Sequence, residues 1–335
     1  MRIIIPMAGW GTRLRPHTLT IPKPMLPIAG KPIVQRLVED LVKSTDQAIE
    51  DIVFIIREDF GKATEEKLMS IGKALGIPSH IRYQDEPLGT AHAILCAGDF
   101  LAGNVVVAFA DTLFRSDFKI DSTQDGVIWV QKVANPSAFG VVKLDAQNLI
   151  TDFIKKPQEF VSDLAIIGIY YFKDGAYLRS EMQYLIDNDI KQKGEYQLTH
   201  ALENMKQKGT RFAKGEVIEW LDCGNKDATV DTNQRVLEHI KNEELIHPTA
   251  VISNSTIIPP CYIGEGVSIQ NSVIGPYVSV GSKSVISGAI VANTIVQEKS
   301  SVKNKLIANS MIGNSVTIEG KIENLSVGDY NVISA

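Results

Sequence analysis

The sequence predicts an α/β domain with a mostly parallel sheet, followed by a parallel β-helix built of hexapeptide repeats. Residues 1 to about 240 alternate short β-branched runs with helical patterns, which is typical of a parallel sheet covered by helices. After residue 247 the pattern changes, and an apolar residue recurs at every sixth position. At about 150 residues per domain, a chain of 335 residues is long enough for two domains. We place them at residues 1–240 and 246–335.

The first region contains strand candidates that are apolar at consecutive positions, as strands covered on both faces must be. We predict strands at residues 2–5, 51–57, 80–84, 104–111, 126–133 and 164–172. A helix is predicted between the first two, because Ile33, Leu37 and Leu41 lie on one stripe at helical spacing. A second helix is predicted over 198–205, ending near Gly209. Ligands of such sheets bind at the carboxyl ends of the strands.

The second region has a six-residue period, which is neither helical nor a simple alternation. We expect each residue in this register to point inward from one flat side of a coil. These residues are Val251, Ile257, Ile263 and Ile269, then Ile274, Val280 and Ile286 after one five-residue step, and the pairs Ile290–Val296 and Ile312–Ile318. Glycines at 264, 275, 281 and 313 suit the tight corners. A β-sandwich is the alternative, but sandwiches do not keep a six-residue phase for this long.

Composition excludes several classes of protein. Hydrophobic residues make up 44% and charged residues 22%, which is close to soluble globular proteins and excludes disorder. The net charge of −5 is opposite in sign to that of most nucleic-acid binders. Three widely spaced cysteines fit neither a disulfide framework nor paired zinc ligands, so we expect a cytoplasmic protein. We expect no membrane partner, because no apolar run approaches the ~20 residues needed to cross a bilayer.

The first predicted strand runs into the glycine-rich loop A-G-W-G-T-R-L-R-P at residues 8–16. Gly9 and Gly11 would let backbone N–H groups turn toward a phosphate, while Arg13 and Lys23 would supply fixed positive charge. A tight strand-to-helix turn also explains such a loop when it is taken alone. It does not explain the wider spacing G-x-G-T-R-L-x-P, followed by P-K-P and then G-K-P-I.

This spacing resembles the sugar-1-phosphate nucleotidyltransferase family, which includes glucose-1-phosphate thymidylyltransferases and uridylyltransferases. The resemblance covers nearly the whole chain. It implies a Rossmann-like nucleotidyltransferase domain and, as in long members of the family, a C-terminal left-handed β-helix. It also implies that the loop binds nucleotide through Ala8, Gly9, Gly11, Thr12 and Arg13.

Further motifs of the same family follow in order. The string Q-D-E-P-L-G-T-A-H-A at 84–93 resembles the base-reading segment, so Gln84 would pair with a pyrimidine and Gly89 would let the backbone approach it. Asp111 ends a predicted strand, and Asp222 lies in W-L-D-C-G, which resembles W-x-D-x-G. Either aspartate alone suits a cap or a turn. Together they resemble the family's Mg²⁺ site, because Mg²⁺ takes few protein ligands and completes its shell with phosphates and water.

The motifs predicted to bind the sugar match the family pattern less well than the nucleotide-binding motifs do. By resemblance, Gly140 in F-G-V-V would offer its backbone to a sugar hydroxyl, and Glu195 in G-E-Y-Q-L-T-H would accept hydrogen bonds from sugar hydroxyls. Lys156 in K-K-P would hold the sugar phosphate. Lys155 replaces the family's glutamate, and its ammonium can donate but not accept a hydrogen bond. Lys155 can point to solvent or into the sugar pocket, and our hypothesis is the pocket. Three other positions depart from the family pattern, namely His200, Ala110 and Asp163.

The resemblance implies transfer of a nucleoside monophosphate from dTTP or UTP to a sugar-1-phosphate, with Arg13, Lys23 and Lys156 as the catalytic residues. The choice of nucleotide and of sugar stays open. Two alternatives are a catalytically weak scaffold subunit and a bifunctional enzyme with an acyltransferase β-helix. The acyltransferase would need a general base, and residues 246–335 contain one histidine, His247. We also expect a homo-oligomer, because a short solenoid exposes its coil faces. The residues expected to face outward are Ile258, Tyr262, Val278, Val285 and Val291.

Overall fold

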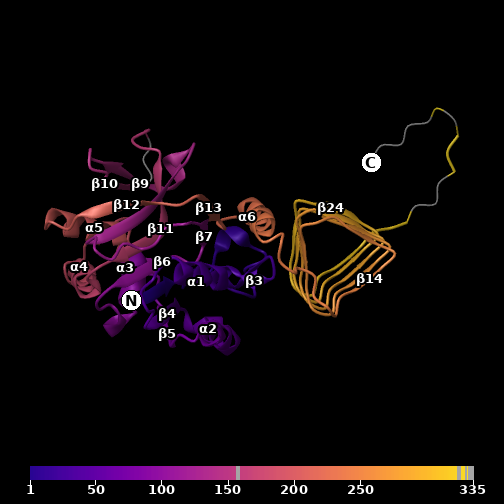
Figure 1. Cartoon of the computed structure of the whole chain (residues 1–335), viewed down its shortest axis with the longest axis horizontal. Coiled ribbons are helices and arrows are strands. Elements are labelled where there is room, and N and C mark those ends of the chain that lie inside the picture. The colour runs from indigo at the N-terminus through magenta and orange to yellow at the C-terminus, as the bar shows by residue number, and fades with distance from the viewer. Residues whose placement is uncertain (156–158, 323–325, 329, 331–335) are drawn as a thin grey trace. The chain divides into compact units, whose positions relative to one another are not determined.

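The computed structural model describes residues 1–155, 159–322, 326–328 and 330 (Figure 1). Contacts divide the chain into two compact units. The first comprises Met1–Pro27 and Lys31–Ala228, and the second comprises Ile28–Gly30 and Thr229–Ala335. The domain limits 1–240 and 246–335 stay a prediction.

The first unit is built on a nine-stranded mixed sheet with the path β10-β9-β11-β6-β1-β4-β5, to which β8 and β12 are added beside β11. Its strands are β1 (Arg2–Pro6), β4 (Asp51–Ile56), β5 (Ser79–Tyr83), β6 (Val105–Ala108), β8 (Gly126–Lys132), β9 (Gly140–Leu144), β10 (Ile150–Lys155), β11 (Leu164–Phe172) and β12 (Phe212–Glu216). The strands β6, β1, β4 and β5 are parallel, whereas β11 runs antiparallel to β6. The fold class is confirmed, with its parallel strands gathered in one half of the sheet.

Two short strand pairs lie outside this sheet. The strands β7 (Thr112–Arg115) and β13 (Glu219–Asp222) pair with each other, as do β2 (Pro27–Ile28) and β3 (Lys31–Pro32). The predicted strand 104–111 therefore ends earlier than expected, at Ala108, and the chain turns before β7 begins.

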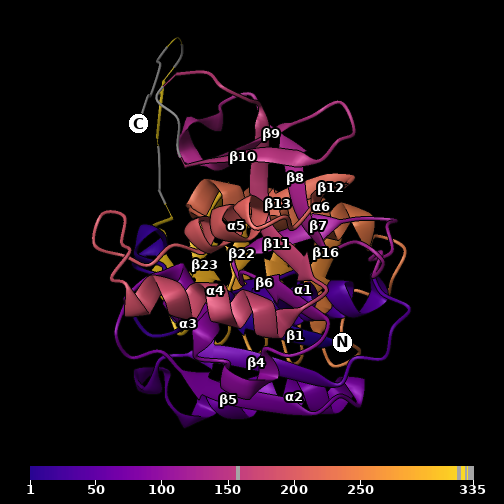
Figure 2. The same cartoon turned by 90° about the vertical axis from the view of Figure 1, so that its left-hand side faces the viewer.

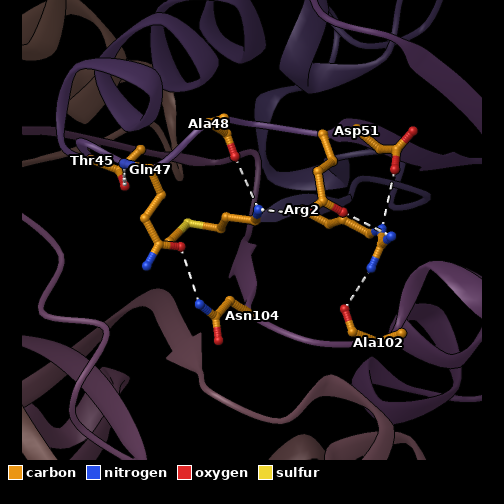
Figure 3. A network of polar contacts seen from close by, with 9 residues as sticks. Arg2, Thr45, Gln47, Ala48, Asp51, Ala102 and Asn104 are labelled. Atoms are coloured by element: carbon orange, nitrogen blue, oxygen red, sulfur yellow. Dashed lines mark hydrogen bonds and ion pairs between the residues drawn. The ribbon is translucent and has the colours of Figure 1, made fainter.

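A polar network secures the amino ends of the parallel strands (Figure 3). The Arg2 guanidinium donates to Asp51 Oδ2 at 3.1 Å and to the Ala102 carbonyl at 2.7 Å. The Asn104 side chain donates to Gln47 Oε1 at 3.1 Å. These contacts tie the starts of β1, β4 and β6 together, so they favour the register that brings the opposite, carboxyl ends to a common edge.

Helices cover both faces of the sheet (Figures 1 and 2). They are α1 (Ile33–Lys43), α2 (Lys62–Leu75), α3 (Thr90–Leu95), α4 (Gly175–Asp187) and α5 (Leu198–Gln207). The last helix, α6 (Lys226–His239), begins in the first unit and belongs mostly to the second. The helices α3, α4 and α5 pack together, and α1 contacts α2 and β7. Both predicted helices are confirmed as α1 and α5. The stripe residues Ile33, Leu37 and Leu41 are fully buried, which explains why α1 forms on the sheet.

The second unit contains the β-helix, whose stacked coils are drawn in orange and yellow in Figure 1. All of its strands pair in parallel, as the hexapeptide period predicted, and they form three sheets of a left-handed β-helix. The first sheet is β14 (Val251–Ser253), β17 (Ser268–Gln270), β20 (Val285–Ser287), β23 (Ser301–Lys303) and β26 (Thr317–Glu319). The second is β15 (Thr256–Ile257), β18 (Val273–Ile274), β21 (Ile290–Ala292) and β24 (Leu306–Ala308). The third is β16 (Cys261–Ile263), β19 (Val278–Val280), β22 (Ile295–Val296) and β25 (Met311–Ile312).

Two positions of the expected inward register are wrong. Val251 is 58% exposed and Ile290 is 50% exposed, whereas Val291 is fully buried. In β21 the inward column is set by stacking, since Val291 pairs with Ile274 below it and Ile307 above it. Neighbouring residues of a strand point to opposite faces, so Ile290 must face outward.

The expected outward residues need correction as well. Val278 and Val291 are fully buried inside the coil, while Ile258 and Val285 are 41% and 39% exposed. Tyr262 is half-buried within its own unit, because its ring packs on Gly30, where a Cβ would come within 2.2 Å of it.

Candidate active site

The carboxyl ends of β1, β4, β5 and β6 surround a cavity of about 340 Å³ in the first unit. This is the edge of the sheet at which ligands of α/β folds bind. Nine of the residues proposed from sequence line it: Ala8, Gly9, Gly11, Arg13, Lys23, Gln84, Gly89, Asp111 and Glu195. Segments far apart in the sequence therefore meet at one site, as the motifs indicated.

The glycine-rich loop follows β1 directly. Gly11 has φ +69°, and a Cβ there would come within 2.6 Å of Lys23 Cβ, so a glycine is required where the lysine stem passes the loop. The Thr18 hydroxyl donates to the Gly11 carbonyl at 2.9 Å and holds the turn. Gly9 is exposed, and a Cβ there would meet no atom within 4 Å.

A buried cation reaches the end of β6. Lys23 Nζ lies 3.0 Å from Asp111 Oδ2, and the exposed fractions of the two side chains are 7% and 46%. The lysine stem is held in the protein while the carboxylate faces the cavity. This arrangement places one fixed positive charge and one carboxylate side by side at the wall of the site.

The second carboxylate, that of Asp222, lies on β13, which pairs with the strand β7 that follows Asp111. Asp222 ends β13 and pairs with Thr112, the residue after Asp111. The Cys223 amide donates to the Asp111 carbonyl at 3.1 Å. Burial raises the pKa of Asp222, and the neighbouring Asp111 carboxylate raises it further, whereas the charge of Lys23 opposes this rise. Two carboxylates in one partly buried place favour the binding of a cation.

Gln84 follows β5 and is 7% exposed. Its amide nitrogen donates to the Gly89 carbonyl at 3.1 Å and contacts His92 Nδ1 at 3.0 Å. The side-chain amide is therefore held by the loop and the helix that follow it.

The segment around Gly89 packs against the segment that carries Glu195. A Cβ at Gly89, where φ is +114°, would come within 2.4 Å of the Tyr196 carbonyl, so the two backbones approach too closely for a side chain. The Tyr196 amide donates to the Leu88 carbonyl at 2.8 Å. Gln197 Nε2 donates to Glu195 Oε2 at 2.7 Å and orients that exposed carboxylate. The segments predicted to bind the base and the sugar are thus joined by direct hydrogen bonds.

Other proposed residues lie away from the cavity wall. Thr12 is exposed in the short 3₁₀ turn Thr12–Leu14. Gly140 pairs with the backbone of Lys155 in the β9–β10 ladder. The adjacent Phe139 ring contacts the Trp220 ring, with centroids 4.9 Å apart, so this ladder lies near β13. Lys156 and the side chain of Lys155 lie outside the described residues.

Several residues that line the cavity were not predicted from the sequence, among them Arg57, Thr90 and Phe109. Arg57 directly follows β4, so the rule that ligands bind at strand ends would have found it. The Arg57 guanidinium donates to Asp59 at 3.0 Å and to the Asp85 carbonyl at 3.3 Å, which holds it at the rim.

The chain matches the nucleotidyl transferase family over residues 2–239, which is well over half of its length. The chain belongs to the nucleotidyl transferase family. The resemblance to sugar-1-phosphate nucleotidyltransferases is thereby confirmed, and the protein is a nucleotidyltransferase enzyme.

Similar proteins agree with this membership. A glucose-1-phosphate thymidylyltransferase of Streptomyces antibioticus is 30% identical over 314 residues, covering 86% of this chain and 85% of that protein. The low-salt glycan biosynthesis nucleotidyltransferase Agl11 of Haloferax volcanii is 29% identical over 324 residues, covering 88% and 87%. The bifunctional protein GlmU of Methanococcus maripaludis is 30% identical over 262 residues, covering 77% of this chain and 60% of that protein.

Solved structures share the nucleotidyltransferase fold. A Bacillus anthracis protein assigned as a glucose-1-phosphate thymidylyltransferase, in complex with sucrose, aligns with a TM-score of 0.59 at 25% identity. The alignment covers 69% of this chain and 93% of that one. A UDP-glucose pyrophosphorylase in complex with UDP-glucose aligns with a TM-score of 0.58 at 23% identity, which shows the fold alone. In the described part of this nucleotidyltransferase, no helix is long and apolar enough to cross a membrane.

Proposed function

We propose that this nucleotidyltransferase transfers a nucleoside monophosphate from dTTP or UTP to a hexose-1-phosphate, with glucose-1-phosphate as the first candidate. The observation that carries the proposal is that Lys23, Asp111 and Gln84, from three separate segments, line one cavity. A cation and a carboxylate for phosphate chemistry thus lie beside an amide suited to a pyrimidine. The thymidylyltransferase name of the Streptomyces relative supports the same assignment.

In this reaction an oxygen of the sugar phosphate attacks the α-phosphorus of the nucleotide. The bond from the α-phosphorus to the oxygen that bridges the α- and β-phosphates breaks, and pyrophosphate leaves with that electron pair. A phosphate monoester has its second pKa near about 6, so the nucleophile is already largely dianionic and needs no general base. Catalysis then consists of holding two polyanions in line and neutralising their charge.

The residues of the cavity are suited to that task. Lys23 is anchored by Asp111 at 3.0 Å and presents its charge to the phosphates, and Arg13 adds a second, exposed cation. Gly9 leaves open space where a Cβ would stand, which supports close approach of a phosphate to the loop backbone. Lys156 is proposed to hold the sugar phosphate, together with Lys155, Gly140 and Glu195 on the sugar side.

Asp111 and Asp222 are proposed to bind Mg²⁺, and members of this family generally use a divalent metal. The donors fit, because both are carboxylates and Lys23 engages one oxygen of Asp111, Oδ2. Among the described residues no group of three or more His, Cys, Asp or Glu side chains could hold a metal, so phosphate and water oxygens would complete the shell, as Mg²⁺ prefers. When bound, Mg²⁺ supplies positive charge next to the α-phosphate.

We also propose a homo-oligomer and a cytoplasmic location. The outward column of β15, β18, β21 and β24 carries Ile290 at 50% and Leu306 at 78% exposure, and a second copy of the chain would cover it. The cysteines Cys96 and Cys261 are free thiols, which suits a reducing compartment.

One assay tests the proposed activity. Pyrophosphate release is measured with dTTP, UTP, CTP, ATP and GTP, each against a panel of sugar phosphates, and acetyl-coenzyme A consumption is measured in parallel. We expect release with dTTP or UTP and a hexose-1-phosphate. Nucleotide binding without turnover on any sugar phosphate would instead identify a scaffold subunit, and acetyl transfer would reveal a bifunctional enzyme.

A further inference from the structure

The orientation of the Gln84 amide is decided by its neighbours. A backbone carbonyl can only accept a hydrogen bond, so the group 3.1 Å from the Gly89 carbonyl must be the amide nitrogen. The same nitrogen lies 3.0 Å from His92 Nδ1. An amide nitrogen has two hydrogens and no acceptor, so both of its donors are used within the protein.

This geometry also determines the state of the histidine. Because Gln84 Nε2 can only donate, His92 Nδ1 must carry the lone pair, and the ring is the neutral tautomer with its hydrogen on Nε2. Burial lowers the pKa of His92, which favours the neutral ring, although the charge of Glu86 opposes this effect. His92 lies on α3, and its side chain is half-buried.

With both donors committed, Oε1 is the atom that Gln84 offers to the cavity. Oε1 is an acceptor, and the imide N3–H of uracil or thymine is a donor. Cytosine has an acceptor at N3, which would face Oε1 without a hydrogen between them. If Gln84 were free to turn, its amide could satisfy either base, so the direction in which it is held determines the choice.

We propose that His92 is a positioning residue for base selection, in which its Nδ1 locks the Gln84 amide with Oε1 toward the nucleotide and thereby favours uracil and thymine over cytosine. The inference rests on the proposed function only in that the cavity binds a pyrimidine nucleotide. His92 itself does not line the cavity, so its effect passes through Gln84.

The test uses the full-length protein with Mg²⁺ and measures calorimetric Kd values for dTTP, UTP and CTP, together with KM and kcat. His92→Phe keeps an aromatic ring but removes the acceptor. We expect about tenfold weaker binding of the preferred nucleotide, the scale of one hydrogen bond, a similar loss of preference over CTP, and kcat within twofold. His92→Asn can place Oδ1 where Nδ1 lies, so it should restore affinity and preference.

His247→Phe is the matched control, because His247 is exposed at the start of the β-helix and hydrogen-bonds to Thr249. Thermal unfolding confirms that each variant is folded. Unchanged Kd and preference in a folded His92→Phe protein would overturn the inference, as would an Asn variant as impaired as the Phe variant. Absence of pyrophosphate release by the wild type would contradict the proposed function instead, and the Kd values would still decide the role of His92.

Discussion

Lys23 and Asp111 form an ion pair of 3.0 Å in which the lysine side chain is 7% exposed and the carboxylate 46% exposed. The lysine comes from the segment after the glycine-rich loop, and the aspartate follows β6, 88 residues later. The Asp111 carboxylate therefore compensates the charge of a lysine that is almost fully buried at the cavity wall. This relationship is the basis of the first two predictions.

Lys23→Met should lower kcat/KM for pyrophosphate release by at least ~100-fold, because a preorganised cation that faces the phosphates is lost. The methionine fits the space of the lysine stem, and Asp111 can be hydrated. Lys31→Met is the control, since Lys31 lies on the surface and pairs with Glu39 at 2.8 Å. A folded Lys23→Met enzyme with wild-type turnover would contradict the role assigned to Lys23.

Asp111→Asn should lower kcat by at least ~100-fold and weaken the dependence of the rate on Mg²⁺ concentration. Removal of divalent metal by a chelator should abolish turnover of the wild type, and added Mg²⁺ should restore it. The control is Asp99→Asn, because Asp99 is 99% exposed and pairs with Arg179. Turnover that persists in the chelator would show that the two carboxylates do not serve a metal.

Nucleotide affinity should fall at acidic pH through His92. The pKa of His92 is lowered by burial from its ordinary value of 6.5, so the ring is neutral at pH 7 and takes a proton only below pH 6.5. Once protonated, Nδ1 donates and can no longer accept from Gln84. The stabilisation that folding gains from the neutral ring is likewise present above pH 6.5 and lost as the pH falls through the folded-state pKa.

The measurement is the Kd for UTP or dTTP between pH 5 and 8 for the wild type and for His92→Asn. Titration of the nucleotide phosphates affects both proteins equally, so the difference between the two curves isolates the histidine. Parallel curves over the whole range would refute this pH dependence.

Lys155→Glu should raise kcat/KM for glucose-1-phosphate by tenfold or more, about 1.4 kcal/mol, because a carboxylate can accept from sugar hydroxyls and an ammonium cannot. Lys143→Glu, on the exposed face of the neighbouring strand β9, makes the same charge change as a control. An unchanged or lower value in the Lys155 variant would show that this residue does not govern the choice of sugar.

The full chain should be larger than a monomer by light scattering at micromolar concentration. Replacing Leu306 by Glu, together with Ile290→Glu, should shift it toward monomers, because a charge would be buried in the interface. Met69→Glu introduces a charge at an exposed apolar position of α2 and should leave the mass unchanged. A wild-type monomer would disprove the oligomer.

Local sequence patterns were sufficient to predict much of the fold of this protein. The six-residue period predicted the β-helix because each coil repeats the same corner and the same inward position. The burial of Ile269 and Ile286 confirms this. Asp111 after an apolar run and Gly11 before Arg13, together with the family resemblance, placed the predicted phosphate and metal site at strand ends, and the function of that site stays a prediction. Each of these patterns lies within a short stretch of the chain, where the geometry of the local backbone determines the spacing of its residues.

Tertiary structure decided the rest. Ile290 and Val291 are adjacent and both apolar, so their directions were settled only by stacking on Ile274 and Ile307. The requirement for Gly89 comes from the Tyr196 backbone, more than a hundred residues away. The direction of the Gln84 amide likewise depends on atoms that the fold brings within hydrogen-bonding distance. A sequence motif can name such a side chain, but its donors and acceptors are assigned by the neighbours that packing provides.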